Sequence, residues 1–399
     1  MSIRSLRPLF TSLALLWIWP AGVPAARAQA PTVELLATLS PAEIAEWQAY
    51  RQARAAFEPA AAAYWTDVET RRQQRRQKKA AAQPLLAGDY VREQPPVYAG
   101  PALSPALVKK IQDAAPKDPD TYIAVVADCL TQARALYKFA PRRVTETEFK
   151  RAYAIEALAH GLTRDQVVRV YAFETGGRGT FDMQAGIDPL NGHGRAISTA
   201  LGYAQLLAAN SSNELVKHGP GFARRLDEMA RRRTLTPERV LELKRKAAVV
   251  RAMLKDLARV PNVWKAHQAF ARTPQGIAIH ALNLDADVGP WLQVLKLKGL
   301  REEAAKAGLF SPSSAEIELM NLSGPATGLE MMLPVAKAVP TANFFDRGGY
   351  ERNSVVRGRT AASLLAEIDT RMQAFLVKPG AIEFARVFDR LAPKPAPVQ

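Results

Sequence analysis

The sequence predicts a mainly α-helical protein, and three observations support this fold class. Apolar residues recur at helical spacing after the first third of the chain, as in Phe149, Tyr153 and Ala157. Capping signals, such as Thr145 followed by Glu148, precede several of these segments. The 399 residues contain neither a strand-rich region nor a repeat of fixed period.

Residues 1–30 have the pattern of a cleavable signal peptide. Arg4 and Arg7 precede an apolar run at 9–19, and small residues suited to cleavage follow near Ala28. The run is short for a membrane span, so an uncleaved anchor is the less favoured alternative. The single cysteine, Cys129, lies in an apolar stretch and is predicted to be a core residue. We therefore expect a periplasmic protein without disulfides.

The chain is strongly basic, with a formal net charge of +16. Such a charge favours anionic partners, here peptidoglycan with its peptide carboxylates or phospholipid headgroups. Nucleic acid is not expected as a partner in an exported protein. Charge alone does not choose between wall and membrane, and a basic surface that serves only solubility is the simplest alternative.

Residues 31–83 are predicted to form a basic helical N-terminal arm. Ser40, Pro41 and Glu43 form a helix-start signal, and Pro59 is expected to kink or split the helix. The cationic run at 71–79 has two interpretations. It contacts membrane headgroups peripherally or wall polymer, or, more simply, it forms a solvated helix face. The seven prolines between residues 84 and 120 predict an extended Pro-rich linker.

A central helical domain is predicted over residues 121–310, followed by a helical C-terminal extension over 311–392 and a disordered tail over 393–399. Within the domain, a glycine-rich connection precedes a second apolar-striped segment from Ile197 to Ala208, which is expected to be helical. A highly charged helical pair should follow over 212–258, with Thr236 at the start of its second helix.

Glu174 is the strongest candidate for a chemical role. Thr163 and Gln166 start a helix on which Val167, Tyr171 and Glu174 share the apolar face. Burial on that face and the negative end of the helix dipole should both raise the pKa of this carboxyl group. General acid/base catalysis requires an acid that holds its proton near neutral pH and can still lose it. The alternative is a glutamate that rotates to solvent at a frayed helix end.

After the glycine-rich stretch stands Ala200-Leu201-Gly202-Tyr203-Ala204-Gln205. With Glu174 and the glycines that follow it, this segment resembles the lysozyme-like superfamily of soluble lytic transglycosylases and goose-type lysozymes, in a divergent alphaproteobacterial-type form. The resemblance covers roughly residues 145 to 290. It implies a lysozyme-like domain with a loop or hairpin after the catalytic helix, and Glu174 as the acid/base.

The same resemblance implies which residues bind the sugar. Gly202, Tyr203 and Gln205 would line the cleft, although Tyr203 and Ala204 replace the usual leucine and methionine. Ala281-Leu282-Asn283 is similar to the family's third motif and implies a substrate contact by Asn283, with leucine in place of the usual tyrosine.

The implied activity is cleavage of the β-1,4 bond between N-acetylmuramic acid and N-acetylglucosamine, with formation of 1,6-anhydromuramyl ends. Peptidoglycan glycan strands would be the substrate, neither metal nor cofactor is implied, and a protein partner in an envelope complex is left open. A hydrolytic muramidase that uses Asp182 or Asp188 as a second carboxylate is one alternative, although loop aspartates are more often turn formers. A non-catalytic wall-binding envelope protein is the other.

Two further features carry less weight. His193 lies near Asp188 in sequence, but one histidine and one aspartate do not make a metal site, and no His-Glu-x-x-His spacing is present. The aromatic and polar segment at 343–353 could line a distal glycan subsite, although a packed surface loop is the simpler interpretation.

Overall fold

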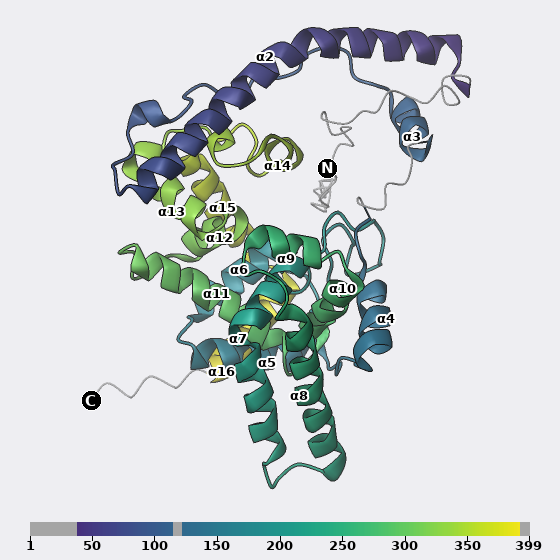
Figure 1. Cartoon of the computed structure of the whole chain (residues 1–399), viewed down its shortest axis with the longest axis vertical. Helices are drawn as coiled ribbons and strands as arrows, with labels where there is room; N and C mark the ends of the chain where they lie inside the picture. Colours follow the sequence, from purple (N-terminus) through teal and green to yellow (C-terminus); the bar gives the residue numbers. More distant parts are fainter. Residues whose placement is uncertain (1–37, 115–121, 392–399) are drawn as a thin grey trace, which may run out of the picture.

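The computed structural model describes residues 38–114 and 122–391, and this part of the chain is mainly helical, as predicted (Figure 1). The predicted leader over 1–30 and the tail over 393–399 lie outside the described residues. The N-terminal helices are α2 (Pro41–Ala80), η1 (Ala87–Asp89) and α3 (Pro105–Ala114). The central helices are α4 (Val126–Tyr137), α5 (Glu146–Ala159), α6 (Arg164–Thr175), α7 (Ala208–Ala230), α8 (Pro237–Leu257), α9 (Trp264–Phe270), α10 (Pro274–His280), η3 (Ala281–Leu284) and α11 (Gly289–Lys306). The C-terminal helices are α12 (Ser314–Ser323), α13 (Pro325–Met332), η4 (Pro334–Ala336), η5 (Thr341–Asn343), α14 (Arg347–Arg352), α15 (Ala361–Leu376) and α16 (Pro379–Leu391).

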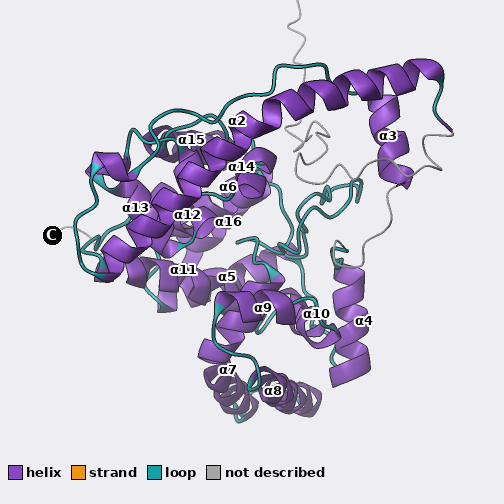
Figure 2. Cartoon of the chain, turned by 45° about the horizontal axis from the view of Figure 1, so that its top comes forward, coloured by secondary structure: helices purple, strands orange, loops and turns teal. Residues whose placement is uncertain are grey.

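The N-terminal arm is one 40-residue helix, α2, which starts at the predicted capping box of Ser40 and Glu43. Pro59 lies inside the helix, and Figure 1 shows that α2 bends along its length but does not split. The predicted linker is partly helical, because α3 forms within it. Leu107 of α3 packs with Trp47 of α2 in a small hydrophobic cluster, so that α3 lies beside the outer end of the arm (Figure 2).

The cationic run near the end of α2 is docked on the rest of the protein. Arg75 is 2% exposed, and its Nε donates a 2.7 Å hydrogen bond to Glu330 of α13. The same guanidinium group donates to the backbone oxygens of Asp89 and Asn343. Lys79 forms a second ion pair with Glu330. The prediction of a solvated helix face is therefore wrong for Arg75, which holds the arm against the C-terminal helices.

Helix α6 is enclosed by C-terminal helices. It packs against α12, α15 and α16, while α5 packs against α16 and α11. One hydrophobic core joins these helices; it includes Phe149, Val170, Leu319, Met372 and Phe384. The predicted boundary at residue 310 is therefore not a boundary between two cores, since the C-terminal extension completes the environment of α6. The aromatic segment at 343–353 is also packed here, with Asn343 fully buried.

A second hydrophobic core lies between α4, α7, α8, α10 and the first half of α11. Cys129 is buried in it, as predicted. Helix α11 contributes Leu292 to this second core and Leu300 to the first, and thereby connects the two. The predicted charged pair is confirmed as α7 and α8, with Thr236 capping α8, and the two helices project together at the bottom of Figure 1.

The connection from α6 to α7 runs through residues 176–207 as a loop crossed by isolated antiparallel bridges, such as Gln184 with Leu201. Within the described ranges no residue belongs to an extended strand. None of the helices described combines the length and the apolar character that crossing a membrane requires.

The buried ion pair of α2 predicts a large difference between two neighbouring arginines. We expect Arg75→Met to lower the free energy of unfolding by about 3–5 kcal/mol, because buried Glu330 keeps only Lys79 as an ion-pair partner and the backbone oxygens of Asp89 and Asn343 lose a donor. Arg76→Met, at an exposed position of the same helix, should change it by no more than about 0.5 kcal/mol. Denaturant unfolding followed by circular dichroism measures both, and equal effects would contradict the role assigned to Arg75.

Candidate functional site

Glu174 occupies the last turn of α6 because the sequence ends the helix directly after it. Thr163 and Gln166 form the predicted capping box at its start, and Gly176 ends it in the left-handed conformation, with φ of +61°. Gly177 also has a positive φ and lies so close to α15 that a Cβ there would be 2.4 Å from the carbonyl oxygen of Phe375. Glycine at this position lets the chain leave α6 beneath the C-terminal helices.

Glu174 meets two side chains of α12 that no sequence motif predicted. Asn321 Nδ2 donates a 2.7 Å hydrogen bond to Oε1 of Glu174, and it lies 3.5 Å from Oε1 of Glu318. The two carboxyl groups are within hydrogen-bonding reach of one another. Glu318 is fully buried, and its Oε2 finds no donor among the described residues. We infer that Glu318 carries a proton, which lets its carboxyl group donate a hydrogen bond to Glu174.

The surroundings of Glu174 and Glu318 give their carboxyl groups different pKa values. Burial raises the pKa of Glu174 to about 7, while hydrogen bonds from Glu318 and Asn321 and the charge of Lys296 oppose this rise. Burial, followed by the charge of Glu174, raises the pKa of Glu318 well above its usual range. Because Glu318 is fully buried and Glu174 is partly exposed, Glu318 keeps its proton and Glu174 exchanges one near neutral pH. Burial raises the pKa of Glu174 in the direction that the sequence predicts.

Lys296 of α11 brings a positive charge to this carboxyl pair. Burial lowers its pKa, and the charges of Glu214 and of the carboxyl pair act in the opposite direction. Within the described ranges, Lys296 forms neither an ion pair nor a hydrogen bond of its own. Burial acts to raise the pKa of Glu214 on α7, but hydrogen bonds from His218 and Lys217 outweigh it and hold that pKa below its ordinary value. Lys296 thus lies between the ionised carboxylate of Glu214 and the pair of Glu174 and Glu318, which holds a proton.

The segment predicted to begin the next helix forms a tight turn instead. Leu201 and Leu206 pair as an antiparallel bridge, and α7 starts only after them. Gly202 has a φ of +74°, and a Cβ there would lie 2.5 Å from Nε2 of Gln293 on α11. The turn and the close approach of α11 therefore explain why position 202 is a glycine, and no bound sugar is needed to explain it. The side chain of Gln205 folds back and donates a 2.8 Å hydrogen bond to the carbonyl oxygen of Gly202.

Tyr203 and Asn283 lie below the surface. Tyr203 is 1% exposed, donates a 2.6 Å hydrogen bond to Glu146, and packs edge to face on Tyr171 of α6, with ring centroids 4.9 Å apart. Asn283 has no exposed surface and donates a 2.6 Å hydrogen bond to Ser211. Their burial does not support the direct sugar contacts expected of them. Tyr203 instead supports the helix that carries Glu174, and Asn283 supports the start of α7.

The two loop aspartates have structural partners. Asp188 accepts a 2.8 Å hydrogen bond from the backbone nitrogen of Leu190, which makes it the turn former that the simpler interpretation expects. Asp182 forms an ion pair with Arg143 and accepts a 2.7 Å hydrogen bond from Thr180. Both aspartates are thus engaged by polar groups of the loop or by Arg143.

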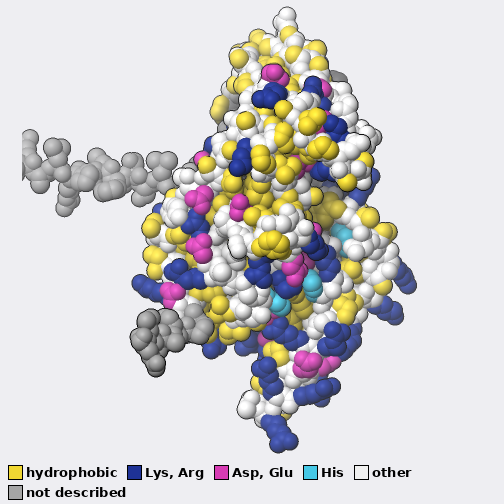
Figure 3. Space-filling model, turned by 90° about the vertical axis from the view of Figure 1, so that its left-hand side faces the viewer, with side chains coloured by type: hydrophobic (Ala, Val, Ile, Leu, Met, Phe, Trp, Pro, Cys, Tyr) yellow, Lys and Arg dark blue, Asp and Glu magenta, His cyan; other side chains and the backbone are white. Residues whose placement is uncertain are grey.

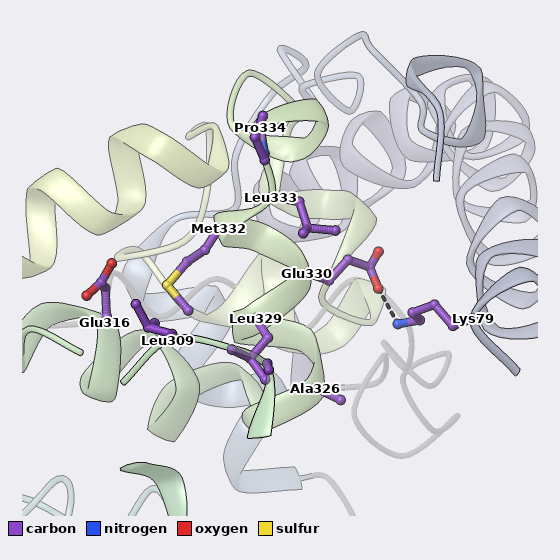
Figure 4. Close-up of a pocket in the computed structure, with 10 residues that line it drawn as sticks. Lys79, Leu309, Glu316, Ala326, Leu329, Glu330, Met332, Leu333 and Pro334 are labelled. Carbon is purple, nitrogen blue, oxygen red and sulfur yellow. Dashed lines mark hydrogen bonds and ion pairs between the residues drawn. The ribbon is translucent and has the colours of Figure 1, made fainter. Parts of the chain in front are cut away.

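A separate hollow of about 390 Å³ lies beside α12 and α13. Figure 4 shows its apolar wall, formed by Ala326, Leu309, Leu329, Met332, Leu333 and Pro334, with the ion pair of Lys79 and Glu330 at its edge. Glu316 lines this hollow, whereas Glu318, two residues further along α12, meets Glu174. Residues two apart in a helix point to nearly opposite sides. The hollow and the carboxyl pair therefore lie on different faces of α12.

Neither a protein-family model, nor a curated protein, nor a solved structure matches this chain. Within residues 38–114 and 122–391, no group of three or more His, Cys, Asp or Glu side chains is placed to hold a metal ion. The chemistry that these residues offer is a carboxyl pair, an amide donor and a neighbouring ammonium group.

One signal in the sequence points to the missed partner. Glu318 interrupts the apolar run of Ile317, Leu319 and Met320, as Glu174 interrupts an apolar helix face. A carboxyl group in such a run is costly to bury unless it is protonated or paired. Pairing the two acids would have required knowing that α12 packs against α6.

The position of the proton can be tested by two substitutions at Glu318. Glu318→Leu removes a hydrogen-bond donor to Glu174, so the pKa of Glu174 should rise above about 7, by on the order of one unit. Glu318→Gln keeps a donor and should leave that pKa close to its value in the parent chain. Carboxyl-carbon NMR titration measures it directly.

Glu316→Gln, on the opposite side of α12, is the matched control and should leave the titration of Glu174 unchanged. A large fall in the pKa of Glu174 in Glu318→Gln would mean that Glu318 is ionised in the parent chain, and would contradict this assignment.

Proposed function

We propose that the protein is a peptidoglycan lytic transglycosylase with a lysozyme-like catalytic domain, in which Glu174 is the sole acid/base. The observation that carries the proposal is the carboxyl pair at the end of α6, in which Glu174 is the partly exposed member and has a pKa of about 7. Such a group is half protonated near neutral pH, which suits both halves of an acid/base cycle. The resemblance of the segments around Glu174 and Gly202 to that superfamily supplies the substrate class.

In the proposed reaction Glu174 donates its proton to the glycosidic oxygen while the bond from that oxygen to C1 of N-acetylmuramic acid breaks. The 2-acetamido oxygen of the same sugar bonds to C1 as the glycosidic oxygen leaves. The Glu174 carboxylate then takes the proton of the sugar's 6-hydroxyl group, whose oxygen bonds to C1 while the bond from C1 to the acetamido oxygen breaks, and the 1,6-anhydro ring closes. No water is consumed, and Glu174 ends the cycle protonated.

The neighbours of Glu174 stabilise its ionised form. When Glu174 gives up its proton, the Glu318 hydroxyl and the Asn321 amide both donate hydrogen bonds to the new carboxylate. Lys296 adds a positive charge nearby. A carboxylic acid that stays neutral in an apolar site and donates a hydrogen bond is an established way to stabilise developing negative charge. In this proposal Glu318, Asn321 and Lys296 are positioning residues, because they act through Glu174.

The hydrolytic alternative has less support from the arrangement of carboxylates. A glycosidase nucleophile or base works at about 5–9.5 Å from the acid, so that substrate or water fits between them. Glu318 lies within hydrogen-bonding reach of Glu174, which leaves no such room. Asp182 and Asp188 are engaged by Arg143 and by a turn.

The proposal predicts the products of wall digestion. Purified peptidoglycan incubated with the protein should yield 1,6-anhydromuramyl ends, detected by mass spectrometry. Glu174→Gln should slow this release by about 10²–10⁴-fold, because the amide cannot transfer the proton. Asp182→Asn and Asp188→Asn serve as controls and should release the same products at the parent rate. Reducing ends would indicate the hydrolase instead, and an undigested wall would indicate a protein that only binds.

The pH dependence follows from the protonated form being the active acid. Since the pKa of Glu174 is raised to about 7, kcat/KM should be retained below that pH and fall as the pH rises through it. In Glu318→Leu this alkaline limb should move to higher pH, together with the pKa of Glu174. An alkaline limb that stays in place in Glu318→Leu would show that another group sets it.

A further inference from the structure

The hairpin of α7 and α8 carries a charge that its own fold does not neutralise. Between residues 224 and 259 there are twelve lysines and arginines but only five acidic residues. Four of these cations have carboxylate partners: Arg225, Arg239, Lys246 and Arg251. The other eight are exposed, and within the described part of the chain none forms an ion pair; they include Arg224, Arg231, Arg232, Arg233, Lys244 and Arg245.

The exposed cations are concentrated where the hairpin projects from the body. Arg231, Arg232 and Arg233 follow directly after α7, at the tip between the two helices. Figure 3 shows Lys and Arg side chains gathered on this projection, at the bottom of the view. Like charges at this spacing repel one another, and an anionic partner would relieve that repulsion.

Helix α7 links this tip to the carboxyl pair. Its first turns carry Glu214 and Lys217, the neighbours of Lys296, and its last residue precedes Arg231. At 1.5 Å per residue, the rise from Glu214 to Arg231 is about 25 Å. A ligand that reaches from the site to the tip must therefore be an extended polymer.

We propose that the α7–α8 hairpin is a docking arm for an acidic polymer, namely the same wall glycan that the site cleaves. The exposed cations of the hairpin would bind the carboxylates of its peptides. This inference rests on the proposed function for the identity of the polymer. The surface of the hairpin favours it over a lipid bilayer. Helices that insert into a membrane interface present exposed Trp, Phe or Leu side chains, and among the described residues of this hairpin the only large exposed hydrophobic side chain is Leu241.

The test measures binding apart from cleavage. In the full chain with Glu174→Gln, three further substitutions, Arg231→Gln, Arg232→Gln and Arg233→Gln, remove the charge of the tip. A control triple, Arg92→Gln, Lys337→Gln and Arg357→Gln, removes the same charge from exposed positions elsewhere. Co-sedimentation with purified insoluble peptidoglycan at low and physiological salt gives the affinity of each chain, and circular dichroism confirms that each is folded.

We expect the tip triple to bind peptidoglycan about tenfold more weakly than its parent at low salt, with a smaller loss at higher salt, because screening already weakens these contacts. The control triple should bind nearly as the parent does. Peptidoglycan whose carboxyl groups have been amidated should bind both triples and the parent equally weakly.

Two results would overturn the inference. One is equal affinity of the tip triple and the control triple for peptidoglycan. The other is a loss seen with phosphatidylglycerol vesicles but not with peptidoglycan, which would assign the arm to a lipid surface. Failure of the proposed function is a separate result: a chain with Glu174 intact that binds the wall through this hairpin but releases no anhydro ends.

Discussion

The hydrogen bond from Asn321 to Glu174, with the proton held on Glu318 beside it, is the contact on which the site depends. It joins the end of α6 to α12 and decides which of two carboxyl groups can exchange a proton. Packing of α12 against α6 contributes to the burial of Glu174, and burial raises its pKa above that of an ordinary glutamate. The buried partner thus has more influence on the acidity of Glu174 than the glycine-rich loop that follows it in sequence.

This contact lies near the helix that connects the two hydrophobic cores. Helix α11 runs through both cores and carries Lys296 to the carboxyl pair, while α7 brings Glu214 from the other side. Burial keeps the proton on the pair, while the hydrogen bonds from Glu318 and Asn321, followed by the charge of Lys296, limit how far burial raises the pKa of Glu174. The opposing contributions leave Glu174 near neutrality, which neither would achieve alone.

The sequence predicted local structure better than long-range contacts. Capping boxes and glycines correctly predicted the ends of α6, and the Thr236 signal predicted the start of α8. The segment around Gly202 was misjudged because a positive φ and contact with Gln293 leave no periodic signal. Arg75 was misjudged for a related reason, since a charged residue on a helix gives no sign of a distant buried partner. Glu318 was missed because pairing across 144 residues depends on packing that no local pattern records.

The carboxyl pair also depends on the order in which its two helices are synthesised. Glu174 and Asn321 are 147 positions apart, so α12 is synthesised well after the helix that carries the acid. A partly synthesised chain has the glutamate but lacks α12, whose packing against α6 contributes to the burial that raises its pKa. The raised pKa of Glu174 is therefore acquired only after α12 has been synthesised and has packed against α6.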